Sequence, residues 1–311
     1  MVAAFFIPVV FMGWKTVIIG SECTVSLTLN RMKITIGNQY QNIPLTDLNT
    51  VIFSHDKTVI TIPVLSKLVE NNICVIICNS KNDPIGIFQP FNNHSLVFKQ
   101  LNKQINWKVT RKKHLWKHIV EQKIQSELDI LKLLDIRDEN AIMLKTYRDS
   151  VYNDDQTNRE AVSARLYFSI LFGKEFTREE PTAVNYALNY GYKIIASYIS
   201  KCIAARGLLT HLGIHHIGES NPFNLTYDFI EPFRSIVDAW VYLYIQETFT
   251  VTHKKELIDI LLAKVSVDGK WLRLSFAIEK IIDSYIAYLN EGTESFPLLE
   301  LTQGIQLYGE E

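Results

Sequence analysis

The chain has 311 residues, of which 47% are hydrophobic and 21% charged, and its formal net charge is −1. This composition is typical of a folded protein with a substantial core, and it excludes collagen-like, low-complexity and intrinsically disordered chains. The near-zero net charge also excludes a uniformly basic surface, so any nucleic-acid-binding surface would require segregated charge. The length favours two domains.

The four cysteines are too few and too scattered to form a disulfide framework, and they lack the paired CxxC spacing of a zinc site. A reducing, cytoplasmic setting is therefore expected. The apolar start of the chain is too short to span a bilayer and lacks a basic region before it, so residues 1–11 are interpreted as an extra strand or an extension. No other segment has the pattern of a membrane span, and no membrane partner is expected.

Residues 14–90 carry the pattern of a small β-rich domain. Short β-branched runs separated by turn residues predict strands in WKTVIIG, TVSLTLN, MKITIG, NTVIF and ICVIIC. Pro63 begins a short run with helical spacing, PVLSKLVENN, and the sequence at Lys81–Pro84 predicts a turn.

From about residue 95 the apolar residues recur at helical spacing, and the segments are long. The first runs through residues 96–134 and is nearly free of Gly and Pro. Gly173 and Gly207 stand where helix ends are expected. The predicted fold is therefore α+β: a β-rich N-terminal domain over residues 1–95, followed by a larger all-α domain over residues 96–311.

One helical stretch concentrates positive charge. Between Lys99 and Lys123 there are eight basic residues against one acid, with Trp107 and Trp116 among them. The stretch predicts either a stripe that neutralises DNA phosphates or a solvated helix face whose tryptophans belong to the core. The residues proposed for DNA contact are Lys99, Lys103, Lys108, Arg111, Lys112, Lys113 and Lys117.

Two other segments carry groups that could bind a metal ion. Glu160 stands at the start of a predicted helix, where an acid can also complement the helix dipole. The second segment is HHIGESNPFNLTYDFIEPFR at 215–234, in which Asp228 and Glu231 are spaced to share one side of a helix that Pro232 predicts to begin nearby. Carboxylates together with a histidine suit Mg²⁺ or Mn²⁺, although a capped helix with incidental acids has the same pattern. Phosphate-binding loops and zinc-protease motifs are missing from the sequence.

Taken together, three segments resemble the CRISPR-associated integrase family, CRISPR-associated protein one, and most of all its members from type II systems. They are NREAVSARLYF around Glu160, PTAVNYALNYGY at 181–192, and GIHH followed by NPFNLTYDFIEPFR. The resemblance implies that Glu160, His216 and Glu231 are the catalytic metal ligands, with Asp228 as a supporting or secondary ligand. His215 and Glu219 then have no role at the metal. The chain departs from the family pattern at Ala161 and Ser235, and residues 1–11 lie outside it.

The same resemblance implies the reaction and the partners. A 3′-OH of prespacer DNA would attack a phosphodiester at the leader–repeat junction in a metal-dependent transesterification, with activity falling below about pH 6 as the histidine is protonated. Implied partners are double-stranded DNA, a second copy joined across the β domains, CRISPR-associated protein two and, in type II systems, the effector nuclease. Two alternatives stay open: a metal-dependent nuclease that cuts branched DNA without integration, and a DNA-binding scaffold without catalysis.

Overall fold

The computed structural model describes residues 15–71, 73–79, 84–88, 97–293 and 295–307. It divides into two compact units, Met1–Asn93 and His94–Glu311. The interpretation of residues 1–11, most of the turn at 81–84 and the expected boundary between residues 95 and 96 lie outside the described residues. Across the described part of the chain, no helix is long and apolar enough to cross a membrane.

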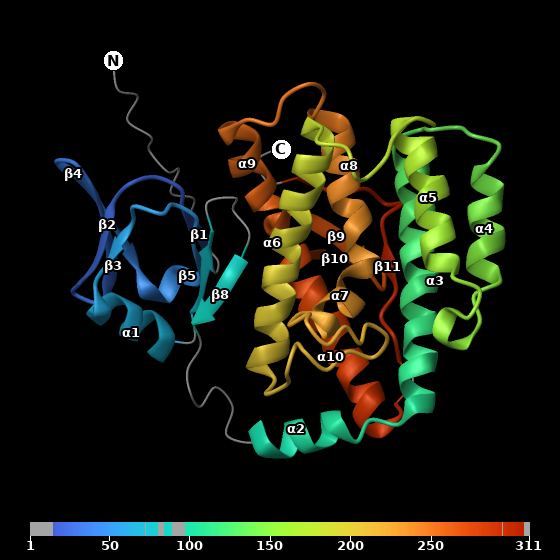
Figure 1. The fold of residues 1–311 in the computed structure, drawn as a ribbon, viewed down its shortest axis with the longest axis horizontal. Helices are drawn as coiled ribbons and strands as arrows, with labels where there is room; N and C mark the ends of the chain where they lie inside the picture. The colour runs from blue at the N-terminus through green and yellow to red at the C-terminus, as the bar shows by residue number, and fades with distance from the viewer. Residues whose placement is uncertain (1–14, 72, 80–83, 89–96, 294, 308–311) are drawn as a thin grey trace. The chain divides into compact units, whose positions relative to one another are not determined.

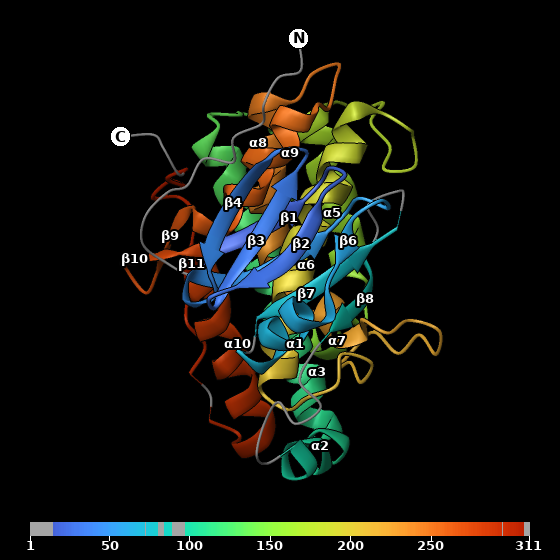
Figure 2. The same cartoon turned by 90° about the vertical axis from the view of Figure 1, so that its left-hand side faces the viewer.

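The described part of the N-terminal unit contains two four-stranded sheets and one α-helix, α1 (Ile62–Glu70) (Figure 2). The first sheet has the strand order β1 (Lys15–Ile19), β5 (Leu48–Phe53), β7 (Cys74–Cys78) and β8 (Pro84–Phe88). The second has the order β4 (Gln39–Pro44), β3 (Arg31–Ile36), β2 (Thr24–Thr28) and β6 (Val59–Ile60). In the first sheet β1, β5 and β7 are parallel, which explains why these strands are continuous apolar runs.

The five predicted strands and the predicted helix of this unit are all present. Strands β4, β6 and β8 were not predicted. In β4, QYQNIP, only Ile43 is buried, because the strand lies at the edge of its sheet and pairs with β3 alone. An edge strand with one buried side chain has no apolar alternation that the sequence could reveal.

The C-terminal unit is mostly helical, which confirms the α+β fold class (Figure 1). Its helices are α2 (Val97–Ile105), α3 (Val109–Leu133), α4 (Ala141–Asp149), α5 (Arg159–Phe172), α6 (Ala183–Ala205), α7 (Asn224–Ile230), α8 (Arg234–Tyr244), α9 (Val251–Ile258) and α10 (Leu274–Glu291). Gly173 and Gly207 follow α5 and α6 with positive φ angles of 100° and 73°, as expected for helix ends.

A small sheet in this unit corrects the prediction of an all-α domain. Three strands have the order β10 (Lys270–Arg273), β9 (Lys264–Val267) and β11 (Leu299–Glu300). Strands β9 and β10 form a hairpin around Asp268 and Gly269, and both of these residues have positive φ angles. This Asp-Gly pair is a strong hairpin signal, but it lies within a stretch whose neighbours are helical on both sides.

The basic stretch also differs from the expected single helix. It breaks at Asn106–Lys108, and α2 and α3 lie on either side of the break. Trp107 is buried there, and its indole N–H donates to Oδ1 of Asn290 at 2.9 Å. The burial of one large aromatic side chain against α10 therefore interrupts a run that is helical by periodicity alone.

Candidate active site

Glu160 and Glu231 approach each other at one buried cation. Glu160 lies in the first turn of α5, and Glu231 lies in a short 3₁₀ turn, η3 (Glu231–Phe233), between α7 and α8. Nζ of Lys123, from the middle of α3, contacts Oε1 of Glu160 and lies 2.7 Å from Oε2 of Glu231. The two carboxylates therefore face the same point, and in this structure an ammonium group occupies it.

Local structure explains how Glu160 is presented. Asp155 is buried and accepts hydrogen bonds from the backbone N–H groups of Arg159 and Glu160, at 2.8 and 2.9 Å. These bonds satisfy two of the free amides at the start of α5 and fix the point where the helix begins. Glu160 is thus an acid in the first turn of a helix, where it can complement the helix dipole, and its side chain also contacts Lys123.

Glu231 is held by two cations at the point where the helix is interrupted. Its Oε1 accepts a hydrogen bond from Nε of Arg234 at 2.9 Å, and its side chain is 5% exposed. Burial alone would raise its pKa, but the charges of Arg234 and Lys123 lower the pKa to about 2. Pro232 was expected in the first turn of a helix, and it stands in the first turn of η3, two residues before α8 begins at Arg234. The helix that carries Asp228, α7, nevertheless begins eight residues before Pro232, at Asn224.

His216 is positioned by Asp228. The fully buried carboxylate of Asp228 accepts hydrogen bonds from the backbone N–H groups of Ile214, His215 and His216, at 2.6, 3.2 and 3.0 Å. It also lies 2.8 Å from Nδ1 of His216. Because a carboxylate only accepts, Nδ1 carries the proton and Nε2 is left with a free lone pair. The hydrogen bond from Nδ1 to Asp228 raises the pKa of His216, and the charges of Glu231 and Glu160 raise it further, against burial.

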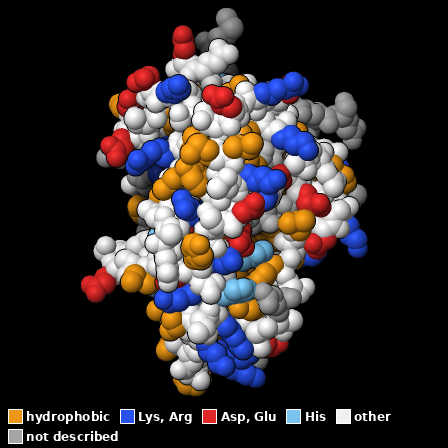
Figure 3. Space-filling view, turned by 90° about the vertical axis from the view of Figure 1, so that its right-hand side faces the viewer, with side chains coloured by type: hydrophobic (Ala, Val, Ile, Leu, Met, Phe, Trp, Pro, Cys, Tyr) orange, Lys and Arg blue, Asp and Glu red, His pale blue; other side chains and the backbone are white. Residues whose placement is uncertain are grey.

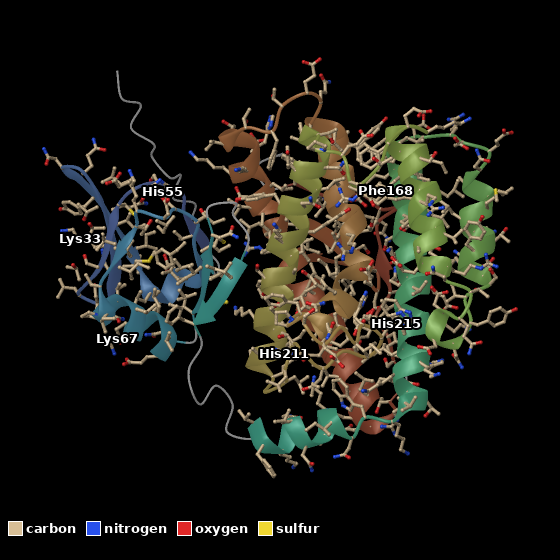
Figure 4. The ribbon with its side chains drawn as sticks, in the orientation of Figure 1. Lys33, His55, Lys67, Phe168, His211 and His215 are labelled. Carbon is tan, nitrogen blue, oxygen red and sulfur yellow. The ribbon has the colours of Figure 1, made fainter. Side chains whose placement is uncertain are left out.

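His215 and Glu219 are placed differently from His216. The ring of His215 stacks on Trp116 at 4.2 Å between centroids, and its Nδ1 is 3.5 Å from Asp154 (Figure 4). Glu219 is exposed. Asp228 is occupied by the backbone of residues 213–218, called the histidine loop below, and by the ring of His216, so its contacts are those of a support.

A polar cavity of about 200 Å³ adjoins the two glutamates. Figure 4 labels Phe168, one of its lining residues, between α5 and α8. Glu127 and Asp238 also line it, and burial raises their pKa values to about 8 and about 7. Neither residue was singled out in the sequence, because only the packing of α3 against α8 makes them neighbours of the site.

The donor types present here suit a hard divalent cation. Two carboxylates converge on a cation, and an imidazole held by a carboxylate through its other nitrogen is the common arrangement of metal-binding histidines. Within the described residues, however, no group of three or more His, Cys, Asp and Glu side chains is arranged to hold a metal ion. The point between the glutamates is taken by Lys123.

Comparison with known proteins identifies the family. The model of the family described as CRISPR associated protein Cas1 matches residues 16–257. The CRISPR-associated endonuclease Cas1 of Neisseria meningitidis serogroup C (strain 8013) is 34% identical over 281 residues, which cover 89% of this chain and 92% of that protein. The chain belongs to the Cas1 family.

Solved structures agree with this Cas1 fold. A casposase bound to integration product superposes with a TM-score of 0.75 at 19% identity and covers 94% of each chain. TM1797, a Cas1 protein from Thermotoga maritima, has a TM-score of 0.72 at 18% identity, over 91% of this chain and 99% of that one. At these identities the likeness concerns the fold.

The basic stretch of this Cas1 chain is only partly available to a ligand. Figure 3 shows Lys and Arg side chains gathered at the lower end of the helical unit, where Figure 1 places α2 and the start of α3, with histidines directly above. Arg111 donates to the carbonyl of Leu289 at 3.0 Å, and Lys113 pairs with Asp154 at 3.0 Å. Lys117 lies 3.6 Å from Glu121. The proposed lysines without an ion pair among the described residues are Lys99, Lys103, Lys108 and Lys112.

The two tryptophans of the stretch belong to the core. Trp107 is 5% and Trp116 is 2% exposed, so they cannot stack on nucleobases. Lys123, counted among the basic residues in the sequence, is likewise buried in the site. The i, i+4 spacing between Lys123 and Glu127 on α3 is the sequence signal that could have distinguished Lys123 from the DNA-binding lysines.

Proposed function

We propose that this chain is a metal-dependent DNA integrase of CRISPR adaptation. It would join the 3′-OH of prespacer DNA to a phosphodiester at the leader–repeat junction. The observation that carries the proposal is the convergence of Glu160 and Glu231 on one cation, beside the histidine loop that Asp228 holds. The casposase that shares this fold was solved with an integration product, and this agrees with the chemistry proposed.

The reaction exchanges one phosphodiester for another. The oxygen of the attacking 3′-OH forms a bond to phosphorus, the bond from phosphorus to the original 3′-oxygen breaks, and the proton lost by the attacking hydroxyl is balanced by the one that the leaving oxygen gains. No nucleotide hydrolysis is needed, which fits the missing phosphate-binding loop.

The proposed ligands of a Mg²⁺ or Mn²⁺ ion are Glu160, His216 and Glu231. The bound ion would supply Lewis-acid stabilisation of the charge that develops on the phosphate. Asp228 holds the proton on Nδ1 of His216, so Nε2 of the neutral ring is the nitrogen that would bind the ion. Arg234 keeps Glu231 ionised in its buried position.

The proposed partners follow from the same family. Duplex DNA would lie along the unpaired lysines of α2 and α3, and phosphate contacts of this kind are independent of sequence. A chain of a Cas6-RT-Cas1–Cas2 complex has a similar fold, with a TM-score of 0.71 at 16% identity over 96% of this chain and 36% of that one, and it supports CRISPR-associated protein two as a partner. A homodimer joined through the β-rich units and contact with the type II effector nuclease rest on the family resemblance.

An integration assay tests the proposal. A prespacer oligonucleotide with a free 3′-OH and a supercoiled target are incubated with the protein and Mn²⁺, and the covalently joined product is measured. We expect joining with the 3′-OH substrate and none with a 3′-deoxy end. Strand breaks without joining would instead favour the nuclease that cuts without integration.

The variant Glu231→Ala separates catalysis from scaffolding. We expect it to bind DNA as the wild type does and to lose joining by at least about a hundredfold, because a ligand of the metal is removed. Joining that persists in Glu231→Ala would contradict the metal site and favour the DNA-binding scaffold.

A further inference from the structure

Lys123 is a buried cation with no role in the proposed reaction. Its side chain is 7% exposed, and its Nζ lies between Glu160 and Glu231. Burial lowers the pKa of a lysine, but the charges of Glu231, Glu160 and Glu127 outweigh burial and raise the pKa of Lys123 above its ordinary value. The ammonium is therefore charged, and it compensates the like charges of the buried Glu231 and the half-buried Glu160, which would otherwise repel each other.

A third carboxylate lies within the reach of the same lysine. Glu127 is one helical turn further along α3, on the same face as Lys123, and it is 3% exposed. Its Oε2 is buried and has no hydrogen-bond partner among the described residues. A buried polar oxygen without a partner is costly, so this one is available to accept a donor. Burial raises the pKa of Glu127 to about 8, and the positive charge of Lys123 lowers it, so an ammonium that arrives at Glu127 would favour the ionised form that pairs with it.

Lys123 and a divalent cation compete for the same oxygens. Both would stand between Glu160 and Glu231. Two cations that contact the same carboxylate oxygens repel each other strongly in a buried site. The displaced ammonium cannot stay buried without a counterion. The flexible four-carbon stem of lysine allows its head group to turn toward Glu127 without movement of the helix.

We propose that Lys123 is an internal counterion that holds the cation position between Glu160 and Glu231 and transfers to Glu127 when a divalent cation binds. The inference rests on the metal site of the proposed function, and it adds a residue that occupies this site before the metal binds. The lysine keeps the two carboxylates together before the metal arrives. It also weakens metal binding, because each binding event must break its two ion pairs.

Mn²⁺ titration by calorimetry of the full chain tests the competition. In Lys123→Met the apolar side chain is of similar length, and we expect Mn²⁺ to bind about tenfold or more tightly than in wild type, since the two ion pairs of Lys123 no longer have to be broken. The matched control is Lys117→Met, which removes the same charge from α3 at an ion pair with Glu121. We expect it to bind Mn²⁺ within about twofold of wild type. Equal or weaker Mn²⁺ binding by folded Lys123→Met overturns the proposal.

A second variant keeps the test decisive if Lys123→Met does not fold. Lys123→Gln retains a hydrogen-bond donor toward the carboxylates but carries no charge, and tighter Mn²⁺ binding is expected for it as well. Glu231→Gln shows whether Mn²⁺ binds at the proposed site, because it should abolish that binding. If it does, and both Lys123 variants bind Mn²⁺ with the affinity of wild type, the metal site stands and only the counterion role of Lys123 is wrong. If neither wild type nor the Lys123 variants bind Mn²⁺, the proposed metal site fails with it.

Glu127→Gln tests the destination of the lysine. In the wild-type background we expect Mn²⁺ binding to weaken by about threefold or more, because the displaced ammonium then meets an amide in place of a carboxylate. In the Lys123→Met background the same change should have no effect on Mn²⁺ affinity, since there is no ammonium to receive. An equal reduction in both backgrounds would show that Glu127 does not receive Lys123.

Discussion

At the scale of single residues, the histidine loop is organised by Asp228. One buried carboxylate fixes three successive backbone amides and one ring nitrogen, so the position of His216 depends on a residue that is twelve positions away in the chain. The loop also passes very close to this carboxylate at Gly213. A Cβ atom there would lie 2.2 Å from the carbonyl oxygen of His216 and 2.7 Å from Oδ2 of Asp228.

Gly213→Ala should therefore disrupt the loop. The added methyl group would collide with the backbone, and we expect the free energy of unfolding to fall by about 1–3 kcal/mol, with Mn²⁺ affinity reduced as His216 moves. Urea unfolding and Mn²⁺ calorimetry provide the measurements. The control is Gly218→Ala in the same loop, where a Cβ would be 3.4 Å from its nearest neighbour and should be tolerated. Equal effects of the two substitutions would contradict the close approach at Gly213.

The pairing of His216 with Asp228 predicts a pH dependence of stability. The pKa of His216 is raised in the folded protein, so its stabilising contribution is complete below the unfolded value of 6.5 and disappears as the pH rises through the folded pKa. We expect His216→Gln to lower the melting temperature more at about pH 5.5 than at about pH 8.5. An equal decrease at both pH values would show that the charged pair contributes nothing.

The raised pKa of His216 also affects metal binding. Coordination requires the neutral imidazole, and a raised pKa keeps His216 protonated to a higher pH. The decline of Mn²⁺ affinity on acidification should thus begin above pH 6.5, rather than near pH 6 as expected from an ordinary histidine.

At the scale of elements, α3 has a different function along each part of its length. Lys108 directly precedes α3 and Lys112 lies in its first turns, and Trp116 supports the histidine loop by stacking on His215. Further along, Lys123 and Glu127 belong to the buried site. A single basic stretch in the sequence therefore contains both proposed DNA contacts and the internal counterion of the active site.

The unpaired lysines of α2 and α3 should set the salt dependence of DNA binding. Replacing Lys99, Lys103, Lys108 and Lys112 by Gln is expected to weaken duplex binding for all sequences. The log–log slope of affinity against salt should fall by about 0.9 for each DNA phosphate that the variant no longer neutralises. Fluorescence anisotropy over a range of salt concentrations measures the slope.

A matched set of four exposed lysines elsewhere in the helical unit controls for net charge. These are Lys132, Lys145, Lys174 and Lys270. Their replacement by Gln should change the slope less than replacement of the α2 and α3 set does. Equal slopes for the two sets would mean that the face formed by α2 and α3 is only solvated.

At the scale of the whole molecule, the chain separates its tasks between two units. The helical unit holds all the proposed metal ligands and DNA-binding lysines, whereas the described part of the β-rich unit contains none of them. The β3–β4 hairpin of that unit exposes Ile36 at 46% and Tyr40 at 65%, and we use these two side chains to test whether the hairpin lies between two copies.

If the β-rich units join two copies, the protein should sediment with about twice the mass of one chain. The double variant Ile36→Glu/Tyr40→Glu should shift it toward the monomer, because it places charges in the interface. The control Leu243→Glu/Phe276→Glu changes two exposed apolar residues of the helical unit and should leave the dimer intact. A monomeric wild type would contradict the dimer, and a dimer that survives the first variant would place the interface elsewhere.

The parts of this protein that depend on local patterns were predictable from the amino-acid sequence. Alternation and helical periodicity predicted five strands of the β-rich unit and most of the helices, and the motifs around Glu160 and 215–234 predicted the family. The edge strand β4 and the break at Trp107 were not predicted, because each is decided by what packs against it. The hairpin at Asp268 has a local Asp-Gly signal, but it was missed because the segments on both sides of it have helical periodicity. The position of Lys123 between two glutamates, and the hydrogen bonds by which Asp228 holds the ring and backbone of His216, are visible only in the folded chain. These relations join residues far apart in sequence, and no local periodicity records which buried charges meet.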